Sequence, residues 1–266
     1  MTRLSRQRAI AFDFDGTLTC ADFNGRFERE FFARLAIDPA RDERDRDEDV
    51  LVDERAVVRA GADPWILATF RATRALRAAG ASELDARAMI ARHFRPAIED
   101  APSPFRDGVG ALLDALDADG VRCFIVSNSP EVSIRARLST VCESAARVVI
   151  VGDAQKFSIV DAERPLAREW QRSLGASRRF AGAPRETLLG RGRYLDALAR
   201  VCASAECAIH ELTVVGDVFE LDLAAPLLLG ARGCSIDHDG RAPWERAALA
   251  SIGATSAADP KTALAL

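Results

Sequence analysis

AIAFDFDGTLT, residues 9–19, joins a short apolar run to two carboxylates, Asp13 and Asp15, which are followed by Gly16 and Thr17. Residues i and i+2 of a strand point to the same face, so both carboxylates can emerge on one side of a strand end. Gly16 lets the backbone turn sharply and approach a ligand closely. Paired acids suit covalent chemistry in which one is the nucleophile and the other moves protons. Asp and Gly are also ordinary turn residues, so a solvated strand-to-turn junction is the alternative.

Length and composition limit the class of protein. The chain has 266 residues, of which 48% are hydrophobic and 29% charged, enough for one large domain or a core with a smaller companion. A formal net charge of −4 gives no reason to expect nucleic-acid or membrane-surface binding. The six cysteines form no CxxC pair or zinc-type cluster, and they suit the reduced thiols of a cytoplasm. No apolar run has the length of a signal sequence or a membrane span, so we expect a soluble cytoplasmic protein.

Several apolar runs, each followed by turn residues and a helical pattern, predict buried strands. They are Ile10–Phe14, Val121–Val126, Val148–Val151, Leu212–Val215 and Ala231–Ile236. Near-continuous apolar runs that alternate with helices indicate a parallel sheet covered on both faces. The helices between them include Val109–Ala118 and Tyr194–Ala203, which carry apolar residues at three- and four-residue spacing. The sequence therefore predicts a doubly wound α/β sheet, whose functional residues gather at the carboxyl ends of the strands.

Two more strand ends carry residues with suitable chemistry. The run VRCFIV ends in Ser127-Asn128, followed by a serine and a proline, and such small polar groups at a helix start can cradle a phosphate. Ser-Asn-Ser is also a common turn or helix cap. The run LTVV ends in Gly216-Asp217, and Glu220 and Asp222 follow, which makes three acids within six residues. Acids just past a buried strand suit magnesium, which takes oxygen ligands, although a charged first helical turn is the alternative.

Together these three strand ends resemble the motifs of the haloacid dehalogenase-like (HAD) superfamily. The first motif is DFDGTLT at residues 13–19, the second is VSN at residues 126–128, and the fourth is Gly216-Asp217 with Asp222. The resemblance implies a Rossmann-like core and an enzyme of the phosphatase type with a smaller α-helical cap domain. In similar dehalogenases and transport ATPases the position of Asp15 is not an aspartate, which implies a phosphatase or a phosphomutase.

The third motif of the family is a basic residue, normally lysine, that neutralises the phosphoryl group and the nucleophile. The only lysines are Lys156 and Lys261, and Lys156 directly follows a strand end, where the family places this residue. Lys156 precedes Gly216 by sixty residues, a longer gap than the resemblance leads one to expect. Arg191 or Arg193, just before a helical pattern, could fill the role instead. An exposed surface lysine is the plain alternative for Lys156.

The first two motifs are separated by about a hundred residues, too many for a simple connection in a compact domain. We expect residues 20–105 to form a helical cap domain inserted into a core of residues 1–19 and 106–266. Helical patterns within this cap cover Phe27–Ala36, Trp65–Ala79 and Glu83–Phe94.

Two charged segments lie outside the motifs. RDERDRDED, residues 41–49, predicts a solvated loop or helix face. Residues 168–193 carry seven arginines and two glutamates. This segment is either an insertion beside the site that attracts anionic substrates or a surface loop that reflects the arginine-rich composition.

The resemblance also implies a mechanism. Asp13 attacks phosphorus to form an aspartyl-phosphate, while Asp15 protonates the leaving group and then activates water. Magnesium (Mg²⁺) would be held by Asp13, the carbonyl of Asp15 and Asp217. Asp222 would complete this metal site by orienting the metal's waters or Lys156.

The phosphoryl oxygens would be held by Ser127, the amide of Asn128 and Lys156. The implied reaction is hydrolysis of a small phosphorylated metabolite, with no nucleic-acid or membrane partner. A phosphomutase would retain the aspartyl-phosphate and transfer it again, so it would form product without free phosphate. A non-catalytic phosphate-binding or regulatory member of the superfamily is the third hypothesis.

Overall fold

The computed structural model describes residues 9–20, 23–39, 44–45, 48–52, 56–59, 64–100, 103–238, 241 and 243–265. The chain divides into two compact units. The larger one consists of Met1–Thr19 and Phe105–Leu266, and the smaller one of Cys20–Pro104. In the sequence, the smaller unit is thus an insertion between the first and second motifs.

The larger unit is built on a six-stranded sheet in which every pair of neighbours is parallel. Its strands, in spatial order, are β10 (Thr255–Ala257), β9 (Arg232–Ile236), β8 (Leu212–Gly216), β1 (Ala9–Phe12), β4 (Arg122–Val126) and β5 (Val149–Val151). The prediction of a doubly wound, Rossmann-like parallel sheet is confirmed. The sequence did not predict β10, an edge strand of three residues of which two are exposed.

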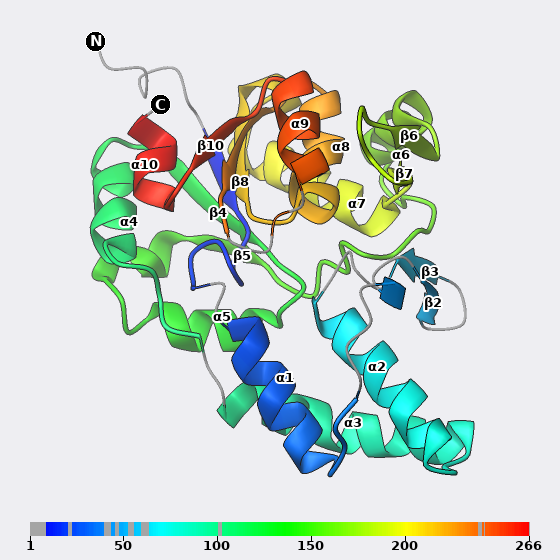
Figure 1. Ribbon diagram of the computed structural model, residues 1–266. Helices are drawn as coiled ribbons and strands as arrows, with labels where there is room; N and C mark the ends of the chain where they lie inside the picture. The colour runs from blue at the N-terminus through cyan, green and yellow to red at the C-terminus, as the bar shows by residue number, and fades with distance from the viewer. Residues whose placement is uncertain are drawn as a thin grey trace. The chain divides into compact units, whose positions relative to one another are not determined.

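Helices cover both faces of this sheet (Figure 1). Alternate residues of β1 point to opposite faces, so Ala9 and Ala11 join one hydrophobic cluster and Ile10 and Phe12 join the other. The first cluster is completed by α6 (Pro165–Leu174), α7 (Gly192–Ala205), α8 (Ala224–Leu228) and α9 (Pro243–Ser251). The second is completed by α4 (Val109–Ala118) and α5 (Glu131–Leu138), while α10 (Pro260–Ala265) follows β10. Of the helices in the described ranges, none has both the length and the apolar content to cross a bilayer.

The chain between β5 and α7 carries an inserted segment, which lies between Val160 and Arg191. This segment accounts for the long gap between the third and fourth motifs. It contains α6 and an antiparallel hairpin of β6 (Ser177–Arg179) and β7 (Glu186–Leu188). A parallel bridge between Val160 and Arg191 closes its base, and Gln171 Nε2 donates to the carbonyl of Val160 at 2.9 Å. The segment therefore leaves the core and returns to it at one place, so its length does not displace α7.

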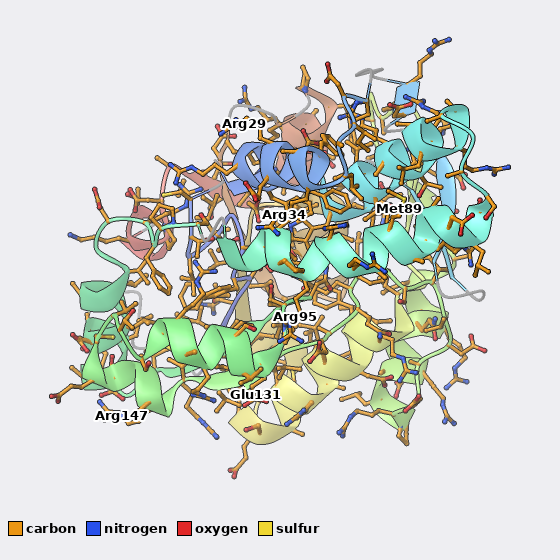
Figure 2. All side chains as sticks on the ribbon, turned by 90° about the horizontal axis from the view of Figure 1, so that it is seen from below. Arg29, Arg34, Met89, Arg95, Glu131 and Arg147 are labelled. Atoms are coloured by element: carbon orange, nitrogen blue, oxygen red, sulfur yellow. The ribbon has the colours of Figure 1, made fainter. Side chains whose placement is uncertain are left out.

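The smaller unit is mostly helical. Its elements are α1 (Phe23–Arg34), β2 (Asp49–Val52), β3 (Ala56–Arg59), α2 (Pro64–Ala78) and α3 (Glu83–Asp100). The antiparallel pair of β2 and β3 was not part of the prediction, which described helices only. Phe27 and Phe31 of α1 stack with ring centroids 5.3 Å apart, and Met89 of α3, labelled in Figure 2, packs against the same hydrophobic cluster.

The charged run at residues 41–49 lies partly outside the described residues. Asp45, which is described, is 1% exposed, and its carboxylate accepts hydrogen bonds from Arg71 Nε at 3.1 Å and from Arg74. A solvated position is therefore wrong for Asp45, because two arginines of α2 pair with it inside the smaller unit.

Candidate functional site

The first motif leaves β1 in a tight turn. The N–H of Asp13 donates to the carbonyl of Val215 at 2.8 Å, so Asp13 continues the sheet pairing just past the end of the strand. Gly16 has a φ of +89°, and a Cβ at this position would collide with the carboxylate of Asp217. Thr17 Oγ1 donates to Asp217 Oδ1 at 3.1 Å. Glycine is required here because the turn must approach the end of β8 closely.

Three buried carboxylates meet where β1 and β8 end. Asp13, Asp217 and Asp222 each place one carboxylate oxygen within 4.8 Å of the others. The side chain of Lys156, which is 3% exposed, lies against this group. Its Nζ donates to Asp13 Oδ1 and to Asp222 Oδ1, at 2.5 Å each. We call these four residues the acidic cluster; Asp13 and Lys156, which are 143 residues apart in the chain, are neighbours within it.

Burial leaves the charges of the acidic cluster unbalanced. Desolvation raises the pKa of Asp13 well above its ordinary value, against the opposing effect of Lys156. Desolvation, reinforced by the charge of Asp222, raises the pKa of Asp217 to about 7. Burial alone would lower the pKa of Lys156, but the charges of Asp13 and Asp222 outweigh it and raise that pKa. Three carboxylates share one ammonium, so the cluster favours the uptake of protons or of a further cation.

The backbone of Lys156 is fixed on both sides. Its N–H donates to Asn128 Oδ1 of the second motif at 2.7 Å. Its carbonyl accepts a hydrogen bond from Arg191 Nη1 at 3.1 Å. The loop after β5 therefore holds Lys156 toward the acidic cluster through contacts that involve its main chain as well as its ammonium.

The two arginines that the sequence left as alternatives to Lys156 make other pairs. Arg191 is 1% exposed, and its Nη2 donates to Glu220 Oε1 at 2.7 Å. Glu220 also pairs with Arg185 of the inserted segment, at 2.9 Å. Arg193 pairs with Glu163 at 2.7 Å, and its side chain is half-exposed. Arg185 and Arg191, two of the seven arginines in residues 168–193, therefore point inward to the carboxylate of Glu220.

Asp15 lies beside the second motif rather than in the acidic cluster. Its Oδ2 accepts a hydrogen bond from Ser129 Oγ at 2.6 Å, and its Oδ1 lies 3.7 Å from the Arg137 guanidinium. Burial raises the pKa of Asp15, while the hydrogen bond from Ser129 and the charge of Arg137 oppose that rise. Ser127 is 1% exposed, and its Oγ accepts the N–H of Ser129 at 3.1 Å, within the turn that precedes α5. Ser129, the residue after the second motif, therefore links this motif to Asp15: it bonds to Ser127 through its N–H and to Asp15 through its hydroxyl.

A family model for haloacid dehalogenase-like hydrolases matches residues 7–164, which is more than half of the chain and includes the first motif, the second motif and Lys156. The chain belongs to this family. No curated protein sequence matches the hydrolase.

Solved structures with the same fold cover most of the hydrolase. A predicted phosphoglycolate phosphatase from Haemophilus somnus 129PT is 14% identical, with a TM-score of 0.53 over 86% of this chain and 85% of that one. YfnB from Bacillus subtilis, bound to magnesium, is 16% identical, with a TM-score of 0.52 over 89% and 91%. A HAD family hydrolase from Deinococcus radiodurans R1, with bound phosphate and sodium, is 15% identical, with a TM-score of 0.54 over 97% and 93%.

Three residues that contact the candidate site were not identified from the sequence: Ser129, Arg137 and Tyr194. Glu220, one of the three acids that follow the run LTVV, pairs with Arg191 and Arg185 and does not join the acidic cluster. Ser129 directly follows the second motif, so the sequence indicates that it lies near that motif. The sequence does not indicate its contact with Asp15. The Arg137 guanidinium lies 4.8 Å from the centroid of the Phe14 ring, a contact that depends on how α5 packs. Tyr194, the only tyrosine, offered a signal by its rarity.

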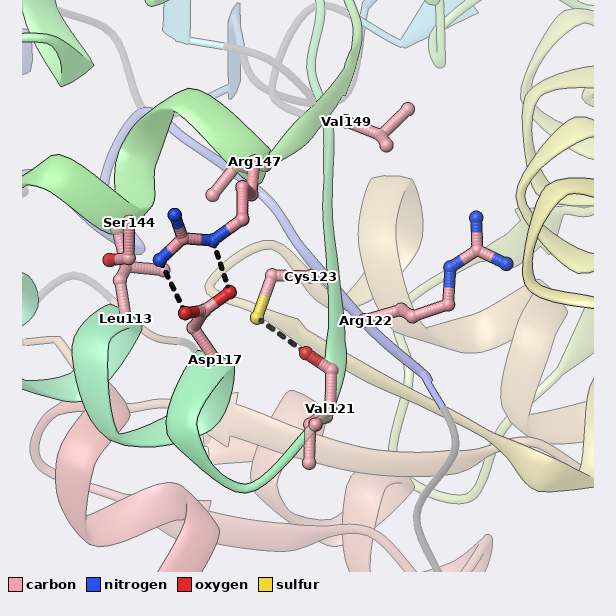
Figure 3. A pocket seen from close by; sticks show the side chains of 10 residues that line it. Leu113, Asp117, Val121, Arg122, Cys123, Ser144, Arg147 and Val149 are labelled. Carbon is pink, nitrogen blue, oxygen red and sulfur yellow. Dashed lines mark hydrogen bonds and ion pairs between the residues drawn. The ribbon is translucent and has the colours of Figure 1, made fainter.

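A separate cavity of about 250 Å³ lies at the amino ends of β4 and β5 (Figure 3). The ion pair of Asp117 and Arg147 lies on its lining, and the Cys123 thiol there donates to the carbonyl of Val121 at 3.7 Å. Its lining includes no member of the acidic cluster, so this cavity lies away from the candidate site.

Proposed function

We propose that this hydrolase is a magnesium-dependent phosphatase that hydrolyses a small phosphorylated metabolite through an aspartyl-phosphate intermediate. The observation that carries the proposal is the Lys156 ammonium held 2.5 Å from Asp13 Oδ1, inside a group of buried carboxylates. A cation at this place neutralises a nucleophile that must approach an anion. Family membership and the position of Asp15 support the same chemistry.

Asp13 acts as the nucleophile. With Oδ1 bound to Lys156, the other carboxylate oxygen attacks phosphorus, and the bond between phosphorus and the leaving-group oxygen breaks. Asp15 gives its proton to the leaving oxygen. Water then attacks the phosphorus of the aspartyl-phosphate, Asp15 takes up the proton from that water, and the phosphate leaves with Asp13 restored.

Asp15 is suited to proton transfer by its surroundings. Burial raises its pKa, which favours the protonated form needed in the first step. The hydrogen bond from Ser129 and the charge of Arg137 limit that rise, which favours the carboxylate needed in the second step. An acid that serves both steps works best when neither form is strongly preferred.

The transferred phosphoryl group is assigned to Ser127, the backbone amide of Asn128 and Lys156. An ammonium has three donors. Two of those of Lys156 go to Asp13 and Asp222, which leaves one for a phosphoryl oxygen. The side-chain oxygen of Asn128 holds the Lys156 backbone, so this residue would contribute its main-chain N–H to the phosphoryl group.

The donor set fits magnesium. Asp13 and Asp217, with the carbonyl of Asp15, would offer oxygen ligands only, which a hard cation requires. The two oxygens of Asp222 are taken by Lys156 and by the N–H of Val218 at 2.9 Å, so we assign Asp222 to orientation of the site. Bound Mg²⁺ supplies positive charge that offsets the nucleophile and the phosphoryl oxygens.

The substrate is assigned to a small phosphorylated molecule on the strength of the fold and the acidic cluster. We propose that residues 20–105 act as the cap that selects it. We also propose a cytoplasmic location, since none of the six cysteines is in a disulfide and reduced thiols are usual there.

The experiment that tests this function measures phosphate release from p-nitrophenyl phosphate and from a panel of phosphorylated sugars, nucleotides and small acids, with Mg²⁺ or with EDTA. We expect release that requires Mg²⁺ and that is lost in Asp13→Asn. Asp153→Asn, which changes an exposed aspartate in the loop after β5, serves as the matched control and should keep full activity. Acid quenching with a radiolabelled ester should trap phosphate on the parent protein but not on Asp13→Asn.

Two other results would replace this function. Conversion of a sugar phosphate into an isomer without free phosphate would identify a phosphomutase. Saturable phosphate binding without turnover of any ester would identify a regulatory member of the family. Equal hydrolysis by Asp13→Asn and the parent would overturn the proposed nucleophile.

A further inference from the structure

The backbone carbonyl of Asp222, in the fourth motif, lacks the hydrogen-bond donor that a regular α-helix would supply. Asp222 belongs to a π-helical turn, Phe219–Leu223, that runs directly into α8. In an α-helix the carbonyl of residue i accepts the N–H of residue i+4. For Asp222 that residue is Pro226, which has no N–H. The π-helical donor would be Leu227, five residues on, but Leu227 lies in α8, where the regular acceptor of its N–H is the carbonyl of Leu223. The chain therefore withholds the regular α-helical donor from a buried carbonyl at the acidic cluster.

Tyr194 supplies a donor to this carbonyl. Its hydroxyl donates to the carbonyl oxygen of Asp222 at 2.6 Å, and the residue is 2% exposed. Tyr194 lies in the first turn of α7 and belongs to the hydrophobic cluster on that face of the sheet. A phenylalanine would fill the same space, so packing alone does not account for the hydroxyl.

Asp222 transmits this contact to Lys156. Its Oδ1 accepts from the Lys156 ammonium at 2.5 Å, and its Oδ2 accepts from the N–H of Val218 at 2.9 Å. The ring of Tyr194 also lies beside Lys156, with Nζ 5.9 Å from the ring centroid. A shift of the Asp222 backbone would therefore move the carboxylate that holds the ammonium against Asp13.

We infer that the Tyr194 hydroxyl replaces the hydrogen bond that Pro226 cannot donate, and that it thereby positions Asp222 and Lys156 for phosphoryl transfer. The inference rests on the proposed function and extends it to a residue outside the motifs. Tyr194 is a positioning residue, since it acts on the phosphoryl site through Asp222 and Lys156.

The test is a double-mutant cycle of Tyr194→Phe and Pro226→Ala. Tyr194→Phe removes the hydroxyl and keeps the ring beside Lys156, while Pro226→Ala gives residue 226 an N–H at the position of the regular α-helical donor, four residues after Asp222. With p-nitrophenyl phosphate and Mg²⁺ we expect Tyr194→Phe to lower kcat about tenfold, because a buried acceptor loses its partner. We expect KM to change by less than about twofold, since the substrate contacts remain. Pro226→Ala alone should stay close to the parent.

The double variant decides between positioning and simple damage. If the hydroxyl replaces the missing helical donor, the restored N–H of residue 226 should bring kcat back to within about threefold of the parent. Full activity of Tyr194→Phe would overturn the inference. A double variant no better than Tyr194→Phe would overturn the link to Pro226. If Tyr194→Phe does not fold, recovery of folded protein in the double variant supports the inference, and failure of both overturns it.

A second measurement separates this inference from the proposed function. The parent, Tyr194→Phe, Pro226→Ala and the double variant are unfolded by urea with EDTA. In the free energy of unfolding, the hydroxyl and the restored N–H should compensate for each other, whatever the enzyme hydrolyses. A parent that hydrolyses no ester contradicts the proposed phosphatase, and the inference is then decided by a cycle on binding of inorganic phosphate with Mg²⁺, measured by calorimetry. Additive effects of the two substitutions on both unfolding and binding would overturn it.

Discussion

The two ends of the central sheet both bring carboxylates and cations together, but under different conditions. At the carboxyl end, Lys156 and Asp13 have side chains that are 3% and 9% exposed. At the amino end, Arg147 and Asp117 have side chains that are 63% and 35% exposed, and they pair on the lining of a cavity. Water screens the second pair and not the first, so the same interaction carries very different free energies.

The pKa values of the aspartates show what this difference means. At the amino end, the hydrogen bond and charge of Arg147 lower the pKa of Asp117. At the carboxyl end, burial raises the pKa of Asp217 to about 7, although a lysine is close by. Buried and unbalanced carboxylates are typical of sites where a ligand offsets their cost, which supports the proposal that the functional site lies at the carboxyl end.

The largest effect is expected from Lys156→Met. Removal of the ammonium leaves three buried carboxylates without a cation, which should lower the free energy of unfolding by about 3 to 5 kcal/mol in EDTA. With Mg²⁺, kcat for p-nitrophenyl phosphate should fall about 10³-fold, the usual loss when a stabilising charge is removed. Lys261→Met changes the other lysine, which is exposed, and should leave both quantities unchanged. Equal losses in the two variants would show that the buried Lys156 contributes no more to stability and activity than the exposed Lys261.

The pH dependence of stability should separate the two ends next. The folded-state pKa of Asp217, about 7, lies above its ordinary value of 3.8, so its contribution to stability is present below about pH 4 and is lost as the pH rises toward 7. Each pH unit in that window changes the free energy of unfolding by up to about 1.4 kcal/mol per proton. In EDTA, Asp217→Asn should therefore weaken the fall in stability between pH 5 and pH 7, measured by urea unfolding.

Asp117→Asn is the control for this experiment. Since the folded-state pKa of Asp117 is lowered rather than raised, its transition lies below that window, and the slope between pH 5 and pH 7 should match the parent. Saturating Mg²⁺ should flatten the slope of the parent too, because the metal takes the place of the protons. A parent whose stability does not change over this range would contradict the unbalanced acidic cluster.

How far the fold could be predicted depends on how much of each strand is buried. β1 and β8 lie inside the sheet with both faces covered, so they appear in the sequence as continuous apolar runs. β6 and β10 have three residues each, of which two are exposed, and such short segments carry no alternation that a sequence pattern can detect. β6 pairs with β7 in a hairpin and β10 pairs with β9, so these strands become recognisable only when their neighbours are in place.

The candidate site divides in the same way. The spacing between Asp13 and Asp15 is local, so the sequence alone places both carboxylates just past the end of one strand. It does not predict that Asp13 contacts Lys156 while Asp15 contacts Ser129. The hydrogen bond of Tyr194 to Asp222 spans 28 residues and depends on how α7 packs against the fourth motif. The spacing of Asp222 to Pro226 was visible in the sequence as a missing helical donor, but the group that replaces that donor was not.

A smaller effect is expected from Glu220→Gln, behind the acidic cluster. Glu220 is 4% exposed and pairs with Arg191 and Arg185, so loss of its charge should lower the free energy of unfolding by about 2 kcal/mol. Glu163→Gln breaks the half-exposed pair with Arg193 and is the matched control, with a much smaller change. Urea unfolding in EDTA measures both. Equal effects would mean that burial does not set the value of these pairs.

The smallest effect is expected where the comparison began, at the amino end of the sheet. Arg147→Gln removes the partner of Asp117, but both groups remain in contact with water, which solvates the aspartate that is left. The melting temperature should stay within about 1 °C of the parent, and kcat should not change, because the cavity lies away from the acidic cluster. A clear loss of activity would show that the two ends of the sheet are coupled. A clear loss of stability alone would show that this exposed pair closes the cavity, which would make burial a poor guide to the value of a charge pair in this hydrolase.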